Sequence, residues 1–370
     1  MIFLYNKAAG RNKLGQNDRT DKKTTVIIPN YNGLRFMDKC MSALEKQTYT
    51  SFRVLIVDNG STDGSAEYIN ELVAGERLLF PIEAVMLPEN TGFSGAVNVG
   101  IKEAQTEYVV LLNNDTEAEP DYLKELIAPL ESDSAKKIGA VSPMMIQLYN
   151  KELLDDAGDG YSLLGWGFQR GVGQSVDTPR FNEEKKIFSA CAGACAYRKS
   201  ALEKIKLPGD AAYFDPMHFA YLEDIDVSFR LRIHGYDVIY EPKSKIYHVG
   251  SGTSGSKYNA FKVRLAARNN VYLNYKNMPL IMLILNLPGI AAGVFIKQLF
   301  FIKIGFGKDY FKGFLEGISN IKECRRHKTF FKAERFFTYI GIELMLLTNT
   351  FSYIWDFAVR QAAKLIKTKR

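Results

Sequence analysis

The sequence is poor in cysteine and histidine. Only four of each occur in 370 residues, and the cysteines, at positions 40, 191, 195 and 324, are too few and too scattered for a disulfide framework. Cys191 and Cys195 share a segment, but no further Cys or His nearby completes a metal-ligand set. We therefore expect free thiols in a reducing compartment.

Two glycine-rich nucleotide-binding motifs are also missing. The first apolar strand-like run is followed by Pro29–Gly33 rather than by the dinucleotide fingerprint, and Gly165–Gly167 does not follow a strand in the required frame. The chain has no Gly-Lys-Ser/Thr phosphate loop. Hydride transfer and P-loop chemistry are therefore poor hypotheses.

The N-terminus lacks a signal-peptide core, and the charge is unevenly placed. The apolar start Ile2–Tyr5 is too short for such a core, so residues 1–23 are expected to form a loosely ordered leader. The net charge is +7, but residues 276–370 hold 16 Lys and Arg against 6 Asp and Glu, which leaves −3 for the remainder. The basicity belongs to the C-terminal quarter.

What the chain does have is a regular alternation of apolar runs and helical patterns. Strands are expected at 24–29, 52–57, 83–87 and 108–112, with helices at 34–47, 65–74 and 94–105 between them. This pattern predicts a parallel sheet covered on both faces. Polar loops follow these strands at 29–32, 58–63, 90–92 and 113–115. Because the carboxyl ends of parallel strands share one rim, these loops predict a binding site there.

Three carboxylates, Glu223, Asp224 and Asp226, fall within four positions at the start of an expected helix. Acids in a first turn are favoured by the helix dipole, and an Asp226–Arg230 pair on a solvated face would explain them without any chemistry. Alternatively, a carboxylate held between like charges and nearby arginines could take a proton from an attacking hydroxyl. The residues alone leave both interpretations open.

The ordered series of motifs resembles the family 2 glycosyltransferases, which use nucleotide-sugars and have the GT-A fold. It looks closest to the rhamnosyltransferase-like branch. The resemblance covers about residues 24–275, and it implies an α/β GT-A domain there with a C-terminal amphipathic helical extension over 276–370. The matching stretches are Val26–Gly33, Val54–Ser65, Glu89–Gly100, Val110–Thr116, Gly193–Leu202, Phe214–Pro242 and Tyr247–Ser254.

The resemblance implies a donor site on the strand ends. Pro29 and Tyr31 would border the nucleoside, Asp58 would accept the N3–H of a uracil or thymine ring, and Asn90 and Gly92 would flank the base and ribose. Asn113, Asn114 and Asp115 occupy the position of the family's DxD motif. Asp115, with His248 as a second ligand, would hold the Mg²⁺ or Mn²⁺ that bridges the diphosphate.

Asn113 departs from the family pattern, because many members keep an Asp there. An amide oxygen can still bind a ribose hydroxyl, but one negative charge is lost, which puts strict metal dependence in doubt. This departure is also the best support for a different class of protein, a catalytically decayed GT-A chain that acts as a glycan-binding or assembly partner.

On the acceptor side, the resemblance implies that Asp224 is the general base of an inverting displacement. Glu223 and Asp226 would orient the acceptor or hold Arg230. Gly193 and Ala194 match the strand that approaches the donor sugar. Residues 150–186, with six glycines, are expected to form a long mobile segment in which Trp166 is a candidate acceptor contact. Packing is an equally good explanation of that tryptophan.

The C-terminal quarter alternates apolar runs with basic residues. Residues 280–302 and 336–358 are largely apolar, and aromatics alternate with Lys and Arg between them. This composition favours helices in an anionic membrane interface over true membrane spans or a soluble helical bundle. Nucleic-acid binding would explain the charge but not the apolar content, so no nucleic-acid partner is expected.

These expectations combine into one hypothesis. The chain would be a hexosyltransferase-type enzyme of polysaccharide or cell-wall biosynthesis, moving a sugar from a UDP- or dTDP-sugar, with dTDP-rhamnose as one candidate, to a glycan or polyprenol-linked acceptor. It would work as a peripheral or monotopic protein at the cytoplasmic face of the plasma membrane. A nucleotidyltransferase is disfavoured because the chain lacks the Gly-rich, Arg/Lys-bearing N-terminal loop such enzymes usually show.

Overall fold

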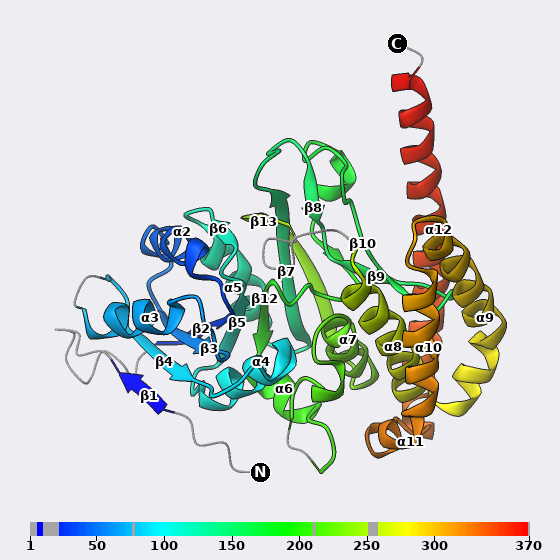
Figure 1. Cartoon of the computed structure of the whole chain (residues 1–370), viewed down its shortest axis with the longest axis horizontal. Coiled ribbons are helices and arrows are strands. Elements are labelled where there is room, and N and C mark those ends of the chain that lie inside the picture. Colours follow the sequence, from blue (N-terminus) through cyan, green and yellow to red (C-terminus); the bar gives the residue numbers. More distant parts are fainter. Residues whose placement is uncertain (1–5, 10–21, 76–77, 210–211, 251–257, 369–370) are drawn as a thin grey trace.

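The computed structural model describes residues 6–9, 22–75, 78–209, 212–250 and 258–368. An 11-stranded sheet runs through the molecule, with helices packed against it and a further group of helices at one side (Figure 1). The strands of this sheet are β1 (Asn6–Ala9), β2 (Thr24–Asn30), β3 (Phe52–Asp58), β4 (Ile82–Met86), β5 (Tyr108–Leu112), β6 (Thr116–Ala118), β7 (Ile138–Gln147), β8 (Leu154–Asp156), β11 (Lys185–Lys186), β12 (Ala194–Arg198) and β13 (Asp237–His248). A separate two-stranded sheet pairs β9 (Asp159–Tyr161) with β10 (Gly167–Gln169).

The helices alternate with the strands in the first half of the chain and follow one another in the last quarter. They are α2 (Leu34–Glu45), α3 (Ser65–Ala74), α4 (Gly92–Glu103), α5 (Tyr122–Ser132), α6 (Lys199–Lys204), α7 (Glu223–Ile233), α8 (Ala260–Asn277), α9 (Leu280–Lys303), α10 (Gly307–Ser319), α11 (Ile321–Cys324) and α12 (Phe336–Thr368). Short 3₁₀ turns lie at Pro179–Phe181, Pro216–His218, Arg325–His327 and Ala333–Arg335.

The predicted parallel arrangement is confirmed for the first four core strands. They lie in the order β4-β3-β2-β5, with all neighbouring pairs parallel. The order reverses between β2 and β5, and this is the point at which open α/β sheets bind ligands beyond their strand ends. Both expected donor loops, after β2 and after β5, therefore start beside each other.

Both faces of the sheet are covered, which explains why its strands are apolar without a break. Along β2, Val26 and Ile28 belong to one core cluster with residues of α2, α3 and α5, whereas Ile27 belongs to a second cluster with α4 and α7. Gly100 of α4 faces Ile27 so closely that a Cβ would lie 2.4 Å from its side chain. Burial on two faces removes the alternation that marks a half-exposed strand.

Three segments differ from the sequence-based expectation. The sheet is mixed rather than wholly parallel, because β12 inserts antiparallel between β5 and β7. Residues 150–186, expected to be mobile, contain β8 to β11 and bury Leu154, Tyr161 and Phe181. Within the expected loose leader, Asn6–Ala9 pair with β4 as an edge strand, while residues 1–5 and 10–21 lie outside the described part of the chain.

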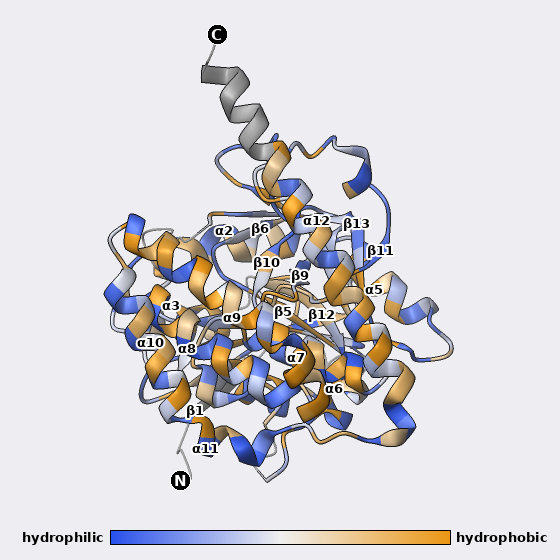
Figure 2. Ribbon diagram, turned by 90° about the vertical axis from the view of Figure 1, so that its right-hand side faces the viewer, coloured by the Kyte–Doolittle hydropathy of each residue, from blue (hydrophilic) through white to orange (hydrophobic). Residues whose placement is uncertain are grey.

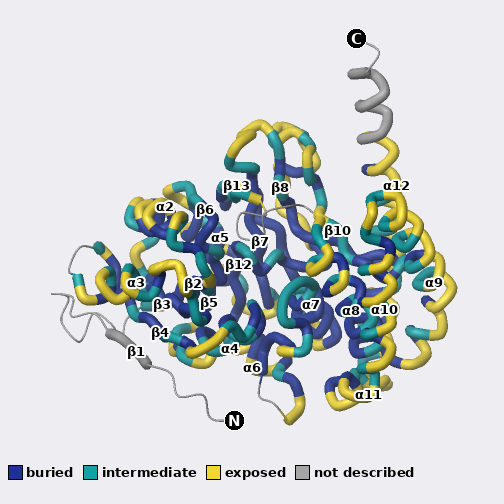
Figure 3. The backbone as a smooth tube through the Cα atoms, viewed as in Figure 1, coloured by how far each residue is buried: buried dark blue, intermediate teal, exposed yellow. Residues whose placement is uncertain are grey.

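The C-terminal helices α8 to α12 gather on one side, and α12 projects beyond the rest of the molecule (Figure 1). Figure 3 shows exposed residues along much of α9 and the coloured part of α12, and Figure 2 shows hydrophobic residues along the same helices. Among the described residues, α9 is the one helix long and apolar enough to cross a membrane by length and composition. Pro288 lies inside α9 without ending it.

Candidate active site

A cleft of about 1340 Å³ opens at the carboxyl ends of the strands. Asp115 follows β5, Asp224 lies in the first turn of α7, and His248 ends β13, yet all three line this cleft. Of the other expected site residues, those that also line it are Pro29, Tyr31, Asn90, Gly92, Asn113, Asn114, Gly193 and Glu223. The fold therefore brings the two halves of the expected site, more than 100 residues apart in the chain, to one place.

The wall formed by β2 and β3 is a hydrogen-bonded network centred on Asn30. Its amide donates to Asp58 Oδ1 at 2.8 Å and to Ser61 Oγ at 3.1 Å, and it accepts from Asn114 Nδ2 at 2.6 Å. Asp58 also accepts the Ser61 N–H at 3.0 Å, is only 2% exposed and is not among the residues that line the cleft. Asp58 thus holds the loop behind the wall.

Asn59 was not singled out from the sequence, although it follows Asp58 directly. It lines the cleft, donates to Asn90 Oδ1 and Gly92 O at 3.0 Å each, and accepts the Thr91 N–H at 2.9 Å. This side chain closes the Asn90–Gly92 turn at the N-terminus of α4. Its neighbour's polarity at a strand end was the only sequence signal that could have identified it.

His248 is held between two carboxylates. Its Nδ1 lies 2.7 Å from Asp155 Oδ2, and its Nε2 lies 3.5 Å from Asp115 Oδ1. Burial would lower the pKa of His248, but hydrogen bonds to Asp115 and Asp155 and their charges outweigh it and raise the pKa to about 10. The pair of carboxylates therefore favours positive charge at this point.

Asp115 and His248 fit a divalent cation. Two ligands at about 2.1 Å from Mg²⁺ on adjacent octahedral positions lie roughly 3 Å apart, close to the observed 3.5 Å separation. Metal-ligating histidines usually give their other ring N–H to a carboxylate, which fixes the tautomer and the ring orientation. Asp155 stands where that partner is required, and the sequence alone gave no reason to select it.

Asp224 lines the same cleft and is oriented by backbone amides. The Ile225 N–H donates to Oδ1 at 2.8 Å and the Ala192 N–H donates to Oδ2 at 3.3 Å. Burial raises the pKa of Asp224, and these hydrogen bonds oppose the rise. A carboxylate with a raised pKa and a fixed direction suits a general base.

Glu223 lies beside Asp224 and is 6% exposed. Burial, followed by the charge of Asp224, raises the pKa of Glu223 well above its usual range. Its Oε2 has no hydrogen-bond partner among the described residues. A protonated Glu223 at this place can donate a hydrogen bond to a ligand in the cleft while Asp224 keeps the negative charge.

Asp226 and Arg230 point away from the cleft into a buried ion cluster. Arg230 Nη2 lies 3.0 Å from Asp226 Oδ2, and Lys276 Nζ lies 3.0 Å from Asp226 Oδ1. Lys276 also pairs with Asp215, which in turn contacts His327. Neither Asp226 nor Arg230 lines the cleft, so this pair supports α7 from behind.

Trp166 and Ala194 are not among the lining residues either. Trp166 is 6% exposed and packs edge-on against Tyr353 of α12, with Lys297 Nζ 4.8 Å from its ring centre. Phe168, two residues on, does line the cleft. Ala194 is fully buried within β12, one residue beyond the cleft-lining Gly193.

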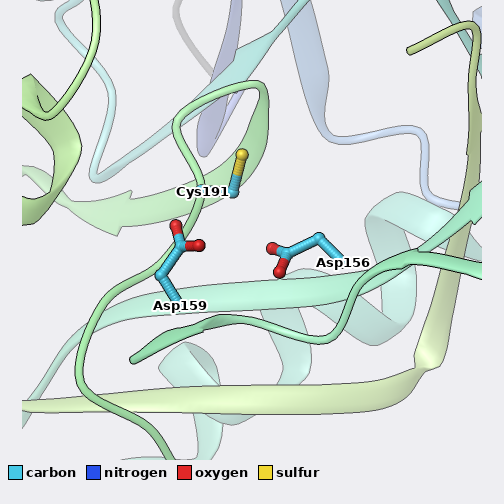
Figure 4. A group of neighbouring side chains, drawn as sticks. All are labelled: Asp156, Asp159 and Cys191. Carbon is cyan, nitrogen blue, oxygen red and sulfur yellow. The ribbon is translucent and has the colours of Figure 1, made fainter. Parts of the chain in front are cut away.

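A second acidic group lies at the edge of the cleft. One side-chain ligand atom each from Asp156, Asp159 and Cys191 lies within 4.8 Å of the others, and Figure 4 shows the two carboxylates facing one another. Burial is the main cause that raises the pKa of Asp156 to about 7. Burial also raises the pKa of Asp159 well above its usual range. Neither oxygen of Asp156 has a hydrogen-bond partner among the described residues.

Comparison with known proteins finds a family match over the first half of the chain. The family model for glycosyl transferase family 2 matches residues 25–206. GlyA of Streptococcus pneumoniae serotype 4 is 35% identical over 106 residues, which are 29% of this chain and 15% of that protein. The poly-β-1,6-N-acetyl-D-glucosamine synthase of Staphylococcus aureus is 27% identical over 239 residues, which are 62% of this chain and 51% of the synthase. The chain thus spans about half the length of the synthase and less of GlyA.

Solved structures agree on the fold. The structure of S. aureus TarS 1–349 with UDP-GlcNAc aligns with a TM-score of 0.54 at 15% identity, covering 89% of each chain. GalNAc-T7 with UDP, GalNAc and Mn²⁺ aligns with a TM-score of 0.53 at 14% identity, covering 71% of this chain and 50% of that one. Residues 25–206 match glycosyltransferase family 2, and the chain has a GT-A-like fold with a helical C-terminal part.

Proposed function

We propose that the protein is an inverting glycosyltransferase that moves a sugar from a UDP- or dTDP-sugar to a hydroxyl of a glycan or polyprenol-linked acceptor. The observation that carries this proposal is the one cleft that Asp115, His248 and Asp224 line together. A charge-binding pair and an oriented carboxylate in the same cleft are what a displacement at the anomeric carbon requires.

The donor lies along the ends of β2 and β5 in this proposal. Pro29, Tyr31, Asn90 and Gly92 border the nucleoside, and Asn113 and Asn114 lie next to the ribose and diphosphate. Asp58, which is buried behind Asn30, supports this wall by accepting from Asn30 and from the Ser61 N–H. TarS 1–349 is bound to UDP-GlcNAc, GalNAc-T7 is bound to UDP, GalNAc and Mn²⁺, and the synthase by its name makes a poly-N-acetylglucosamine. These names support a uridine donor without fixing the sugar.

Asp224 acts as the base. It takes the proton of the acceptor hydroxyl, the acceptor oxygen forms a bond to the anomeric carbon, and the bond from that carbon to the diphosphate oxygen breaks. The nucleoside diphosphate leaves on the opposite face, so the configuration inverts and no covalent enzyme intermediate forms. Glu223, in its protonated form, donates a hydrogen bond to the acceptor substrate and so orients it.

Asp115 and His248 would hold a divalent cation, Mg²⁺ or Mn²⁺. Bound there, it would supply positive charge to the diphosphate leaving group. Asp155 keeps the His248 Nε2 directed at the ion through the hydrogen bond to Nδ1.

The decisive experiment measures the release of UDP or dTDP from a panel of nucleotide-sugars, with glycan and polyprenol-linked acceptors. Asp224→Asn removes the base and keeps the size of the side chain, and its amide oxygen can still accept one of the two backbone N–H bonds. We therefore expect a loss of about 10²–10⁴-fold in kcat. Donor affinity, measured by thermal shift with and without Mn²⁺, should stay the same. Asp121→Asn, outside the cleft, is the control. Acceptor-dependent release that Asp224→Asn leaves unchanged would refute the proposed base.

We also propose that residues 276–370 seat the GT-A region, residues 24–275, on the cytoplasmic face of the plasma membrane. One side of α12 is apolar and exposed, with Phe337 at 84% and Phe351 and Trp355 at 67% each. The opposite side buries Tyr339, Ile342 and Leu346 against α7 and α8. Because one apolar face of α12 already packs in the core, its second, exposed apolar face needs another apolar partner.

The charge of this region fits an anionic bilayer. Basic side chains stand exposed between the apolar helices, at Lys303, Lys308, Lys312, Lys322, Arg325 and Arg326. Each cation near an anionic surface contributes about 1 kcal/mol to membrane binding. A lipid-linked acceptor would then meet the cleft at the surface on which the protein lies.

A further inference from the structure

The backbone immediately before Asp224 is held in an unfavourable conformation. Phe219 has φ 62° and ψ −61°, and the Ala220 N–H donates to His218 O at 2.7 Å, which together define a γ-turn of the rare, positive-φ kind. Tyr221 and Leu222 follow with φ 70° and 69°. Non-glycine residues in this region cost about 1–3 kcal/mol each, so surrounding contacts must hold the turn.

Asn269 of α8 supplies those contacts. Its Nδ2 lies 2.9 Å from His218 O, 2.9 Å from Ala220 O and 2.8 Å from Tyr221 O. The two amide hydrogens are therefore shared among three carbonyl groups of one turn. Asn269 is fully buried and does not line the cleft, so it acts on the turn and not on a ligand.

Arg268 fixes the direction of that amide. Its Nε donates to Asn269 Oδ1 at 3.1 Å, which leaves the Asn269 nitrogen facing the turn. Its Nη2 donates to Met217 O at 3.0 Å and to His218 O at 3.1 Å. Adjacent side chains of α8 thus hold carbonyls at four of the five positions from 217 to 221.

The remaining carbonyl, Phe219 O, connects the turn to the donor side of the cleft. It accepts the Ser94 N–H of α4 at 3.2 Å. Gly92, with φ 77°, lies so close that a Cβ would be 2.5 Å from Phe219 O. The loop expected to border the nucleoside and the turn that presents the base are therefore in direct backbone contact.

We propose that Asn269 is the positioning residue of the base: by holding the 218–222 turn it sets where Asp224 stands relative to the donor. This inference rests on the proposed function, and it assigns to α8 a role in the chemical step rather than in donor binding. A displacement of about 1 Å at a reacting group can cost about 10²-fold in rate.

The test compares Asn269→Ala with Asn274→Ala. Asn274 is a buried amide on the same helix, and it bonds to Tyr161, Gly165 and Asn270 but not to the turn. With the best donor and acceptor found, we expect Asn269→Ala to lose about 10²-fold in kcat with little change in donor KM. Asn274→Ala should keep kcat within about threefold at a similar loss of thermal stability. Equal kcat losses in both variants, or a raised donor KM at unchanged kcat, would overturn the proposal.

Hydrogen exchange gives a readout that needs no activity. Amides in the 217–226 stretch should exchange faster in Asn269→Ala than in the wild type, and at the wild-type rate in Asn274→Ala. If the wild type transfers no sugar, the proposed function fails while the exchange result still measures the turn. If transfer occurs and exchange in this stretch does not respond to Asn269→Ala, the inference alone fails. Should Asn269→Ala not fold, Arg268→Met removes the outer donors and keeps the packing stem.

Discussion

The ring of His248 is oriented by Asp155, a residue that was not among the expected site residues. Asp155 holds the Nδ1 side of the ring at 2.7 Å, so Nε2 is the atom presented to Asp115. Without Asp155 the imidazole could rotate or change tautomer. Partners of this kind contribute to metal affinity although they never touch the ion.

Asp155→Asn should therefore weaken the binding of Mn²⁺ by about 10- to 100-fold while leaving the fold intact. Metal titration followed by calorimetry or by electron paramagnetic resonance measures this directly. Glu152→Gln, an exposed acid three residues earlier, is the matched control and should bind Mn²⁺ like the wild type. Equal affinities in all three proteins would show that Asp155 does not orient a metal ligand.

Asp156 predicts a pH dependence of stability. Burial raises its pKa from 3.8 to about 7, so the folded state favours the neutral acid. The corresponding stabilisation is fully present below pH 4 and is lost as the pH rises through about 7. At about 1.4 kcal/mol per pKa unit, the free energy lost has an upper limit of about 4 kcal/mol.

Asp156→Asn should abolish this loss, because an amide does not ionise. Thermal unfolding at pH 5 and pH 8 should show the variant gaining on the wild type as the pH rises. Asp177→Asn, outside the buried acidic group, should follow the wild type at both values. A variant that is less stable than the wild type at pH 8, with the difference removed by a chelator, would instead point to a cation held by Asp156 and Asp159.

At the scale of elements, α7 is fixed from behind by ions and not by packing alone. Lys276 of α8 is fully buried between Asp215 and Asp226. Burial would raise the pKa of both acids, but Lys276, with Arg230 at Asp226 and His327 at Asp215, holds each pKa well below its usual range. Their contribution to stability is therefore present above about pH 4 and is lost as the pH falls below it.

Lys276→Met should destabilise the protein by roughly 3–5 kcal/mol at pH 7, because two buried carboxylates lose their shared cation. Denaturant unfolding at pH 7 and near pH 3 measures the effect. The deficit should shrink at the lower pH, where the acids can be protonated in the variant. Lys322→Met, an exposed cation of α11, should change stability little at either pH. A deficit that does not change with pH would mean that the lost contacts are apolar.

The elements also show what the sequence could predict. The apolar strands and their polar ends predicted that β2 to β5 form a parallel sheet with polar loops at one rim, because periodicity and turn residues are local signals. The order β4-β3-β2-β5 came only from the structure. The antiparallel entry of β12 and the pairing of β1 were missed, since strand partners depend on contacts far apart in the chain. Asp155 and Asn269 were missed for the same reason: their roles exist only once β13 and the 218–222 turn lie beside them.

At the scale of the whole molecule, the helix that carries Asp224 and the C-terminal helices share one core. Ile225 and Phe229 of α7 pack in the same cluster as Leu273 of α8, Met282 of α9 and Leu346 of α12. The C-terminal helices are thus part of the support of the cleft and not a tethered appendage. Seating them on a bilayer would hold the cleft at a constant height and orientation above the lipid surface.

The 370-residue protein should therefore bind vesicles of mixed neutral and anionic phospholipid. Binding should weaken with salt but persist in part, because screening removes the charge attraction and leaves the apolar contact. Replacing Phe337, Leu344 and Phe351 by Glu places three charges on the exposed apolar face of α12 and should reduce partitioning by at least about tenfold. Co-sedimentation or vesicle flotation gives the partition coefficient.

The control must add the same charge without touching that face. Glu at Thr50, Asn70 and Ser134, exposed positions in the first half of the chain, changes the net charge equally and should lower partitioning only slightly. Similar losses in both triple variants would mean that net charge alone governs binding. Absence of wild-type binding to anionic vesicles would leave the exposed face of α12 to a protein partner, because an apolar stripe of this length needs a cover of some kind.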